Sequence, residues 1–251
     1  MILYEHPFNE RTRYMIRLEY LFKQLFEFSR LPEPMYQHVA FSILFEILDV
    51  CERGDCRNWV IQEIEKQKIN LESLRNHPDV QKNLLDDTLN KLNRVSKNLT
   101  AVSKLGGHMR ESEWLMSLRN RFVTPGATSP MDSPSYNAWM NGSESERLQV
   151  MRSLVDPFMP LYDAIAMSLM VLREAAEPTE EVTGSSGVFE KSVGGRIYQM
   201  VRVWLPTGDR IYPEMSGNKY VVMIRFFKIN KDFEQSFIKH PIQFKMALCH
   251  V

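Results

Sequence analysis

Apolar residues recur every three or four positions through most of the chain, which is the spacing of amphipathic helices. The pattern is clearest at residues 10–29, where Asn9 just before the first turn is a typical N-cap. Similar patterns predict helices at residues 35–53, 55–75, 79–105, 109–122, 143–156 and 160–176, and a short helical turn at 135–140. The first two thirds of the chain are therefore predicted to be helical.

Two of these helices have further properties. The helix at 55–75 is polar and is separated from the next by His77-Pro78, so the two are expected to form an antiparallel hairpin. The helix at 160–176 is the most apolar and is expected to be the central buried helix. Its seventeen residues, with Asp163 near one end and Arg173 near the other, make a poor membrane span.

Helical spacing stops at residues 177–187, where all residues but Val182 are Glu, Pro, Thr, Gly or Ser. Strand-forming residues follow at 188–189, 197–205, 220–229 and 244–249, separated by turn residues, which predicts a meandering antiparallel sheet. The apolar segment at residues 2–5 is expected to join that sheet as a short strand. The fold class is thus α+β, an N-terminal multi-helix region followed by a C-terminal antiparallel β-region. We expect a mainly helical domain at 1–180 and a β-strand domain at 181–251 packed against it.

The segment at residues 49–57 lies between two predicted helices and reads as a helix-turn-helix corner. Gly54 is expected to supply a left-handed conformation that ends the first helix, and Asp55 to cap the second. Arg53 and Arg57 lie at this corner. They either pair with Glu52 and Asp55 or form an anion-binding corner suited to a carboxylate.

A second candidate lies on the predicted strand at 220–229. Residues two apart share a face of a strand, so Met223, Arg225 and Phe227 point one way, and Ile224 and Phe226 the other. A face that mixes a guanidinium with apolar side chains suits a short peptide with a carboxylate and hydrophobic anchors. The alternative is a plain solvent-exposed face.

The composition narrows the class of protein. The chain has 251 residues, 44% of them hydrophobic, and 31 basic residues balance 31 acidic ones, so no global field attracts nucleic acid or anionic lipid. The N-terminus lacks the layout of a secretion signal, and we expect a cytoplasmic protein. Cys51, Cys56 and Cys249 fit a reducing compartment and are interpreted as small buried thiols rather than as zinc ligands with His250.

Enzyme signatures are missing from the sequence: it has no Gly-x-Ser-x-Gly, phosphate loop, dinucleotide fingerprint or His-Glu-x-x-His motif. His108 lies near Glu111 and Glu113 but is interpreted as structural. We therefore expect no enzyme, no cofactor and no metal. A nucleic-acid- or ribosome-associated adaptor is the alternative to a protein-binding function.

Several short motifs, in one order along the chain, resemble the ZapD family of bacterial cell-division proteins. They are Glu5-His6-Pro7 with Asn9-Glu10, Arg13 and Arg17; Leu48-Asp49-Val50 with Glu52-Arg53-Gly54 and Arg57; Arg121 with Pro125-Gly126; Trp139; and Tyr212-Pro213 with Ser216-Gly217, Lys219 and Ile224-Arg225-Phe226. The resemblance runs from residue 5 to about residue 227 and returns in the last predicted strand.

The resemblance implies a symmetric homodimer without enzymatic activity, located in the cytoplasm at the division site. Members of that family bind the C-terminal tail of the tubulin-like protein FtsZ and cross-link its filaments into bundles at midcell. No nucleic acid and no membrane insertion are implied. The tail-binding residues it implies are basic: Arg53, Arg225, Arg17, Lys219 and Arg57. Glu113, Asn137 and Val221 stand where other members have basic residues, so the rim of the site is expected to differ.

Overall fold

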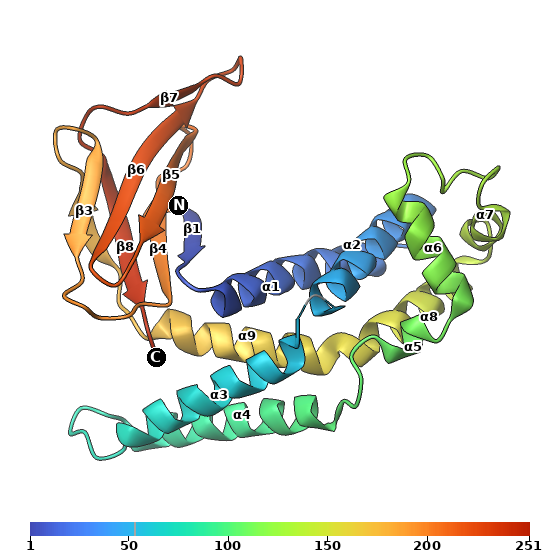
Figure 1. The fold of residues 1–251 in the computed structure, drawn as a ribbon, viewed down its shortest axis with the longest axis horizontal. Coiled ribbons are helices and arrows are strands. Elements are labelled where there is room, and N and C mark those ends of the chain that lie inside the picture. The colour runs from blue at the N-terminus through green and yellow to red at the C-terminus, as the bar shows by residue number, and fades with distance from the viewer. Residues whose placement is uncertain (53) are drawn as a thin grey trace. The chain divides into compact units, whose positions relative to one another are not determined.

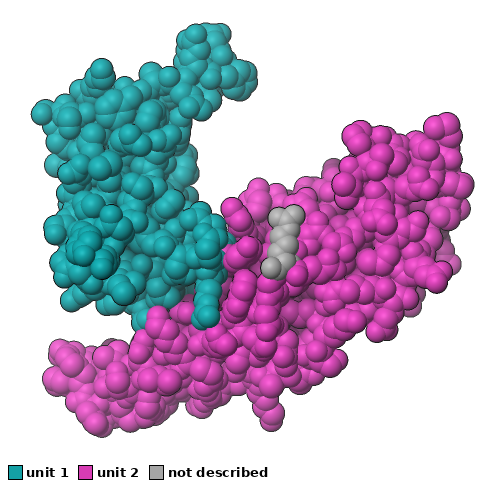
Figure 2. Space-filling model, viewed as in Figure 1, with its two compact units in different colours: residues 1–13, 169–251 teal, residues 14–168 magenta. Residues whose placement is uncertain are grey.

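The computed structural model describes residues 1–52 and 54–251 (Figure 1). Contacts between residues divide the chain into two compact units, coloured in Figure 2. The β unit consists of residues 1–13 and 169–251, and the helical unit of residues 14–168. The predicted α+β class, with helices before the strand-rich region, is confirmed. The predicted folding domains at 1–180 and 181–251 stay a prediction, since the two units named here are defined by contacts alone.

The helices have the following bounds: α1 (Glu10–Ser29), α2 (Pro34–Glu52), α3 (Cys56–Ser73), α4 (Lys82–Ala101), α5 (Gly107–Arg110), α6 (Glu113–Val123), α7 (Pro134–Met140), α8 (Glu144–Val155), a 3-10 turn (Asp156–Phe158) and α9 (Met159–Glu174). The predicted cap of α1 is confirmed, because Asn9 Oδ1 accepts from Thr12 N at 2.8 Å. The apolar face of α1 is buried as expected, and the side chains of Phe22 and Leu25 are fully covered.

The predicted hairpin of α3 and α4 is also confirmed (Figure 1). Arg75, which follows α3, pairs with Asp86 near the start of α4 at 2.8 Å. Near the other end, Arg57 of α3 contacts the carbonyl oxygen of Thr100 on α4. Because early positions of α3 meet late positions of α4, the two helices run antiparallel.

Two helix predictions need correction. The single helix expected at 109–122 is broken into α5 and α6, because Ser112 caps a new helix by accepting from Leu115 N at 3.3 Å. Leu84, assigned to the apolar stripe of α4, is 63% exposed, and the buried stripe begins instead at Leu85.

The helix predicted to be central is buried. Leu161, Ile165 and Leu169 of α9 are fully covered. The helical run Glu144–Glu174 is long and apolar enough to cross a membrane by length and composition, and 56% of its most apolar window is buried inside the protein. Core helices pass the same test, so this run is weak evidence for a membrane span.

The strands have these bounds: β1 (Ile2–Pro7), β2 (Thr179–Val182), β3 (Val188–Ser192), β4 (Met200–Leu205), β5 (Ile211–Gly217), β6 (Val221–Ile229), β7 (Gln235–Phe237) and β8 (Gln243–Cys249). They form two antiparallel sheets rather than the single meander that the sequence predicted. One sheet has the order β1-β4-β8-β2; the other has the order β3-β6-β5, with β7 also paired to β6. The N-terminal strand joins a sheet as expected, pairing with β4.

The core of the β unit lies between the two sheets. Val222, Ile224 and Phe226 of β6 are buried, and the ring of Phe226 lies 5.0 Å from that of Phe244 on β8. Because β6 and β8 belong to different sheets, these contacts pack the sheets face to face. Arg225 alternates with the buried residues and is exposed, which confirms the predicted faces of this strand.

Three strands were missed, and their sequences explain why. β2 is held partly by ion pairs such as Glu180 with Lys245 at 2.8 Å, so apolar alternation does not mark it. β5 contains Pro213, which cannot donate to a ladder and is tolerated because β5 is an edge strand. β7 has only three residues. Conversely, Ile197, predicted to begin β4, lies before that strand and is 76% exposed.

Glu5 of β1 explains part of the N-terminal motif. Its carboxylate accepts from Nη2 of Arg173 at 2.7 Å, on α9, and from Nε of Arg202 at 3.0 Å, on β4. The three side chains are between 12% and 19% exposed. This network joins the first strand to β4 and to the end of α9, so the motif residue Glu5 has a structural role.

Candidate partner-binding site

The outer face of β6 carries Arg225, with about half of its side chain exposed. Strand register places Arg225 between Glu214 of β5 and Val188 of β3. Nη2 of Arg225 lies 3.6 Å from Oε2 of Glu214, whose side chain is equally exposed. An exposed pair at this distance contributes little to stability, so the guanidinium can exchange Glu214 for a carboxylate from a ligand.

A row of aromatic rings continues this face beyond Arg225. Phe227 lies between Tyr212 of β5 and Phe237 of β7, with ring centroids 5.9 and 5.5 Å apart. All three rings are partly exposed. We call Arg225 and these three rings the sheet face. It offers one cation beside an apolar row, which is the chemistry expected from the sequence.

Lys219 lies in the turn between β5 and β6. Asn218 shapes this turn, because its Oδ1 accepts from the backbone N of Tyr220 at 2.8 Å and of Val221 at 3.1 Å. Nζ of Lys219 lies 5.0 Å from the centroid of the Tyr220 ring, which is 62% exposed. The hairpin β5–β6 thus carries both basic residues that were predicted in this part of the chain.

The other predicted basic residues belong to the helical unit. Arg17 is exposed on α1. Arg57 on α3 donates from Nε to the carbonyl oxygen of Leu99 at 3.2 Å and from Nη2 to that of Thr100 at 2.7 Å, so it caps the end of α4. Carbonyls at a helix C-terminus lack intrahelical partners and attract cations. Arg53 lies outside the described residues.

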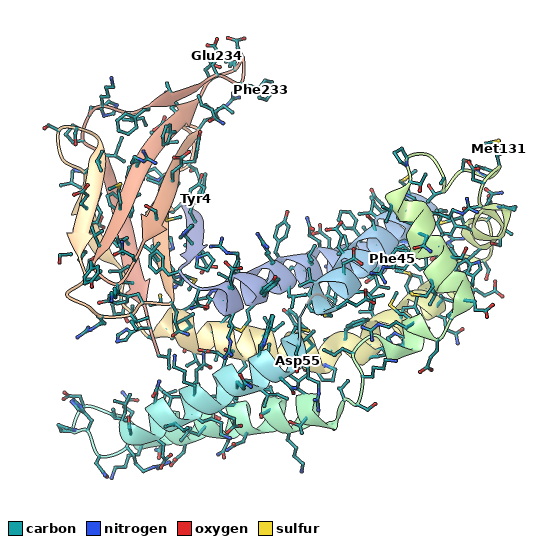
Figure 3. The ribbon with its side chains drawn as sticks, viewed as in Figure 1. Tyr4, Phe45, Asp55, Met131, Phe233 and Glu234 are labelled. Carbon is teal, nitrogen blue, oxygen red and sulfur yellow. The ribbon has the colours of Figure 1, made fainter. Side chains whose placement is uncertain are left out.

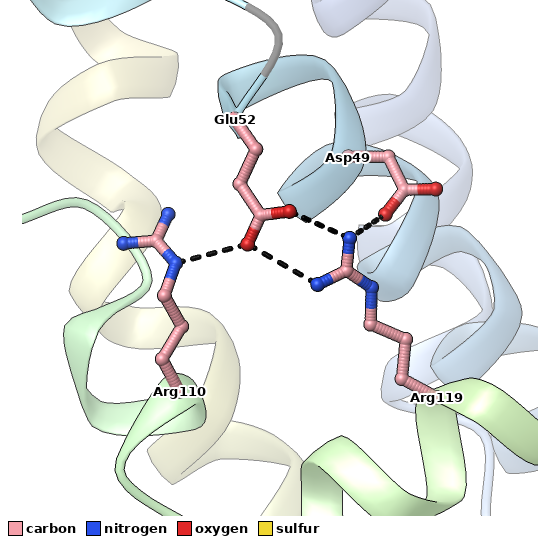
Figure 4. A network of polar contacts seen from close by, with 4 residues as sticks. All are labelled: Asp49, Glu52, Arg110 and Arg119. Carbon is pink, nitrogen blue, oxygen red and sulfur yellow. Dashed lines mark hydrogen bonds and ion pairs between the residues drawn. The ribbon is translucent and has the colours of Figure 1, made fainter.

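The corner itself is held by Glu52, for which the sequence predicted different partners. Its carboxylate accepts from Nε of Arg110 at 3.0 Å and from Nη1 and Nη2 of Arg119 at 3.1 and 2.6 Å (Figure 4). Arg119 also pairs with Asp49. These hydrogen bonds, led by those from Arg119, lower the pKa of the Glu52 carboxyl from its ordinary value of 4.5. The network ties the end of α2 to α5 and α6.

The second helix begins after Gly54 as expected. Asp55 accepts from Asn58 N at 3.4 Å and from Asn58 Nδ2 at 2.5 Å, which confirms its cap. A Cβ at Gly54 would lie 2.2 Å from the ring of Trp59, so a larger residue here would require that ring to move. The left-handed conformation of Gly54 stays a prediction because its backbone angle involves Arg53. Glycine at this corner is therefore explained by the close approach of Trp59.

An aromatic cluster that the sequence did not predict surrounds Trp139. Its ring lies 5.1 Å from that of Phe41 and is stacked on that of Tyr136 at 6.1 Å. Nδ1 of His38 lies 2.9 Å from the Tyr136 hydroxyl. Burial lowers the pKa of His38 and raises that of Tyr136. Trp139 thus has a packing role within the helical unit, and Phe41 comes from a distant segment that spacing along the sequence does not reveal.

His108 and the three cysteines, the candidates for catalysis or metal binding, pack within the protein. Nε2 of His108 lies 3.1 Å from the carbonyl oxygen of Leu154, and its ring contacts Phe158. The three cysteines are buried. Within residues 1–52 and 54–251, no group of three or more His, Cys, Asp or Glu side chains is arranged to hold a metal ion.

The chain is thus an α+β protein with a helical unit and a two-sheet β unit, and the β unit carries an exposed face of one arginine and three aromatic rings. The chain belongs to the ZapD family, described as a cell division protein, whose match covers residues 16–225. A role in cell division follows from this membership.

Relatives that carry the family name match this chain over nearly its full length. The chain is 39% identical over 249 residues to the cell division protein ZapD of Bordetella petrii, which covers 99% of each chain. The ZapD of Bordetella pertussis is also 39% identical over 249 residues, 99% of this chain and 98% of its own. That of Janthinobacterium sp. is 38% identical over 250 residues, 99% of each. These relatives carry the name of a cell-division protein rather than that of an enzyme.

Proposed function

We propose that this protein binds the C-terminal tail of FtsZ and cross-links FtsZ filaments, stabilising the Z ring at midcell in the cytoplasm. One observation carries the proposal: the sheet face places the half-exposed guanidinium of Arg225 beside a row of partly exposed aromatic rings. Membership of the ZapD family supports it. The proposed activity is binding alone, without catalysis, cofactor, nucleic acid or membrane insertion.

In this proposal each part of the sheet face has a task. Arg225 exchanges its weak pairing with Glu214 for a carboxylate of the tail, and the aromatic row takes apolar side chains of the tail. Lys219, in the β5–β6 turn, adds positive charge that favours an acidic peptide. Arg17 and Arg53, which belong to the helical unit, are further basic residues of the proposal. Arg57 contributes indirectly, because two of its nitrogens donate to carbonyl oxygens at the end of α4 and so hold α3 against α4.

Cross-linking follows from valence. A symmetric homodimer offers two equivalent sites, and a filament displays one tail for each subunit. Once one site is occupied, the second meets its tail at high effective concentration, so modest affinity for one tail gives strong lateral linkage.

The test is co-sedimentation with polymerised FtsZ, using full-length FtsZ and FtsZ without its C-terminal tail. We expect binding and bundling only with the tail present. Arg225→Glu should abolish both, because it places a negative charge where the tail carboxylate binds. Arg196→Glu, at an exposed arginine outside the sheet face, is the matched control and should bundle normally.

The outcomes are distinct. Equal binding to tail-less FtsZ would move the site away from the tail. Normal bundling by folded Arg225→Glu would remove the sheet face from the proposal. Binding to neither form of FtsZ would contradict the proposal and favour the adaptor alternative, which binding of mixed oligonucleotides across a salt series would then test.

A further inference from the structure

Two cysteines flank the corner between α2 and α3. Cys51 lies in the last turn of α2, and Cys56 is the first residue of α3. Their side chains are 8% and 4% exposed, and neither forms a disulfide. The sheet face belongs to the other unit and contains neither thiol. The pair therefore carries chemistry that the proposed function does not use.

The corner brings the two thiol side chains together. Asp55, which is exposed at the start of α3 (Figure 3), caps that helix, and Cys56 N donates to the carbonyl oxygen of Gly54 at 2.9 Å. Because of this tight turn, the first residue of α3 lies next to the last turn of α2, and the Cys51 thiol donates a hydrogen bond to the Cys56 sulfur. Two cysteines whose side chains already face each other can form a disulfide without large backbone movement.

The two thiols differ in acidity. The hydrogen bond from Cys51 lowers the pKa of Cys56 against the opposing effect of burial, and the backbone N–H of Arg57 adds to the lowering. N–H groups in the first turn of a helix lack intrahelical partners and stabilise a thiolate. The pKa of Cys51 is raised, because its thiol donates that hydrogen bond and is buried. Cys56 is thus the nucleophile of the pair, with the Cys51 thiol held beside it.

Cys249 provides a reference within the same chain. It is fully covered on β8, and burial raises its pKa to about 11. The other two cysteines of the sequence belong to the helical unit, so the β unit holds no second thiol. A buried thiol with a raised pKa and no second thiol in its unit is expected to be inert toward mild oxidants.

We propose that Cys51 and Cys56 form a redox-active dithiol that reacts with hydrogen peroxide and closes to a disulfide within one chain. The small exposed fraction of each side chain favours an oxidant close in size to water. The reaction consumes one peroxide for each chain and needs no residue of the sheet face. The inference is therefore independent of the proposed function.

The reaction balances in two steps. The Cys56 thiolate attacks one oxygen of the peroxide, the O–O bond breaks, and the departing hydroxide takes the proton that Cys56 released and becomes water; Cys56 is then a sulfenic acid. The Cys51 sulfur attacks the Cys56 sulfur, the S–O bond breaks, and the departing hydroxide takes the Cys51 proton as a second water. The two thiols together lose two electrons, and the peroxide gains them.

The first test maps the product in the wild-type protein. Reduced protein is treated with hydrogen peroxide, denatured, alkylated with N-ethylmaleimide and digested with trypsin, which cleaves after Arg53 and so separates the two cysteines. By mass spectrometry we expect a disulfide that joins the peptides of Cys51 and Cys56, and alkylation of Cys249 alone. A reducing agent should restore all three thiols.

The second test assigns a role to each thiol. Cys56→Ser removes the nucleophile and should slow the loss of free thiol under peroxide at least about 10-fold. Cys51→Ser should still react, but should stop at the sulfenic acid of Cys56, which dimedone traps. Cys249→Ser is the matched control and should form the disulfide at the wild-type rate. Circular dichroism verifies the fold of each variant, and the mapping of wild-type protein needs no variant.

The third test follows the rate of reaction with pH. The rate should rise as the Cys56 thiolate forms, with a midpoint below the ordinary thiol pKa of 9.0. Cys51→Ala removes the hydrogen bond to the Cys56 sulfur and should move the midpoint to higher pH. A purely structural role for Cys51 would leave the midpoint unchanged.

A disulfide between Cys51 and Cys56, formed slowly or not at all without the nucleophile, would support the inference. Three free thiols after peroxide treatment, or a disulfide that includes Cys249, would overturn it. Oxidation of Cys51 and Cys56 to sulfonic acids without a disulfide would overturn it as well. Pelleting with FtsZ reports on the proposed function separately, so the failure of one proposal is distinguished from that of the other.

Discussion

At the scale of single residues, Arg225 and Arg57 show how context divides similar side chains. Arg225 is half exposed and lies 3.6 Å from an equally exposed carboxylate, so its charge is available. Arg57 is committed to two carbonyl groups at the end of α4. Both belong to family motifs, yet only Arg225 presents its guanidinium on an open face. Mutation of Arg57 therefore changes the fold locally before it changes binding.

Glu214 competes with a bound carboxylate for Arg225 in the proposed complex. Glu214→Gln removes this competitor and should tighten binding of an FtsZ tail peptide about two- to fivefold, the range of an exposed ion pair. Fluorescence anisotropy of a labelled tail peptide measures the change. Glu190→Gln, on the neighbouring strand β3, is the control. Weaker binding by Glu214→Gln would mean that Glu214 positions Arg225 rather than competing for it.

At the scale of elements, the ties between helices matter more than any one helix. Glu52 joins the end of α2 to α5 and α6 through Arg110 and Arg119 (Figure 4). The folded-state pKa of Glu52 lies below its ordinary value of 4.5. Its contribution to stability is therefore fully present above pH 4.5 and is lost as the pH falls through the lower, folded pKa.

Glu52→Gln should lower the free energy of unfolding at pH 7 by about 1 kcal/mol, a modest value because the network is partly open to solvent. Below pH 4.5 the wild-type advantage should shrink, and the two proteins should converge. Urea unfolding at a series of pH values measures this. Glu46→Gln, at an exposed carboxylate of α2, is the control. A constant difference between wild type and Glu52→Gln down to pH 2 would contradict the ion-pair account.

The elements also show what sequence can and cannot predict. Helical spacing located α1 and α9, and period-two alternation located the faces of β6 and hence Arg225. Neither pattern predicted β5, because Pro213 is unusual in a strand and is tolerated only at the sheet edge. Neither predicted the break before α6, which depends on the hydroxyl of Ser112. The arginine partners of Glu52 and the carbonyl partners of Arg57 are 42 or more positions away in the chain, a distance over which spacing carries no information.

At the scale of the whole molecule, the first strand pairs with a strand about 200 residues later in the chain. The antiparallel register of β1 and β4 runs from Ile2 opposite Leu205 to Pro7 opposite Met200. Deleting residues 1–7 leaves β4 without a partner on one side and removes Glu5 from Arg173 and Arg202. We expect faster hydrogen exchange in β4 and β8, with α2 unchanged, measured by mass spectrometry. Deletion of residues 1–2 alone, which spares Glu5, is the control. Unchanged protection of β4 would contradict a structural role for the first strand.

The pairing of β1 with β4 also sets the order in which segments of the chain can fold during synthesis. Pro7 leaves the ribosome about 190 residues before its partner Met200. At about 5–20 residues per second, the first strand waits for roughly 10 to 40 seconds with its backbone unpaired. The helical segments at residues 14–168 emerge during that interval and their local contacts form quickly. The N-terminal strand is therefore synthesised first but is among the last segments to fold. Until the C-terminal strands have been synthesised, the N-terminus of the nascent chain is exposed to incorrect strand pairing.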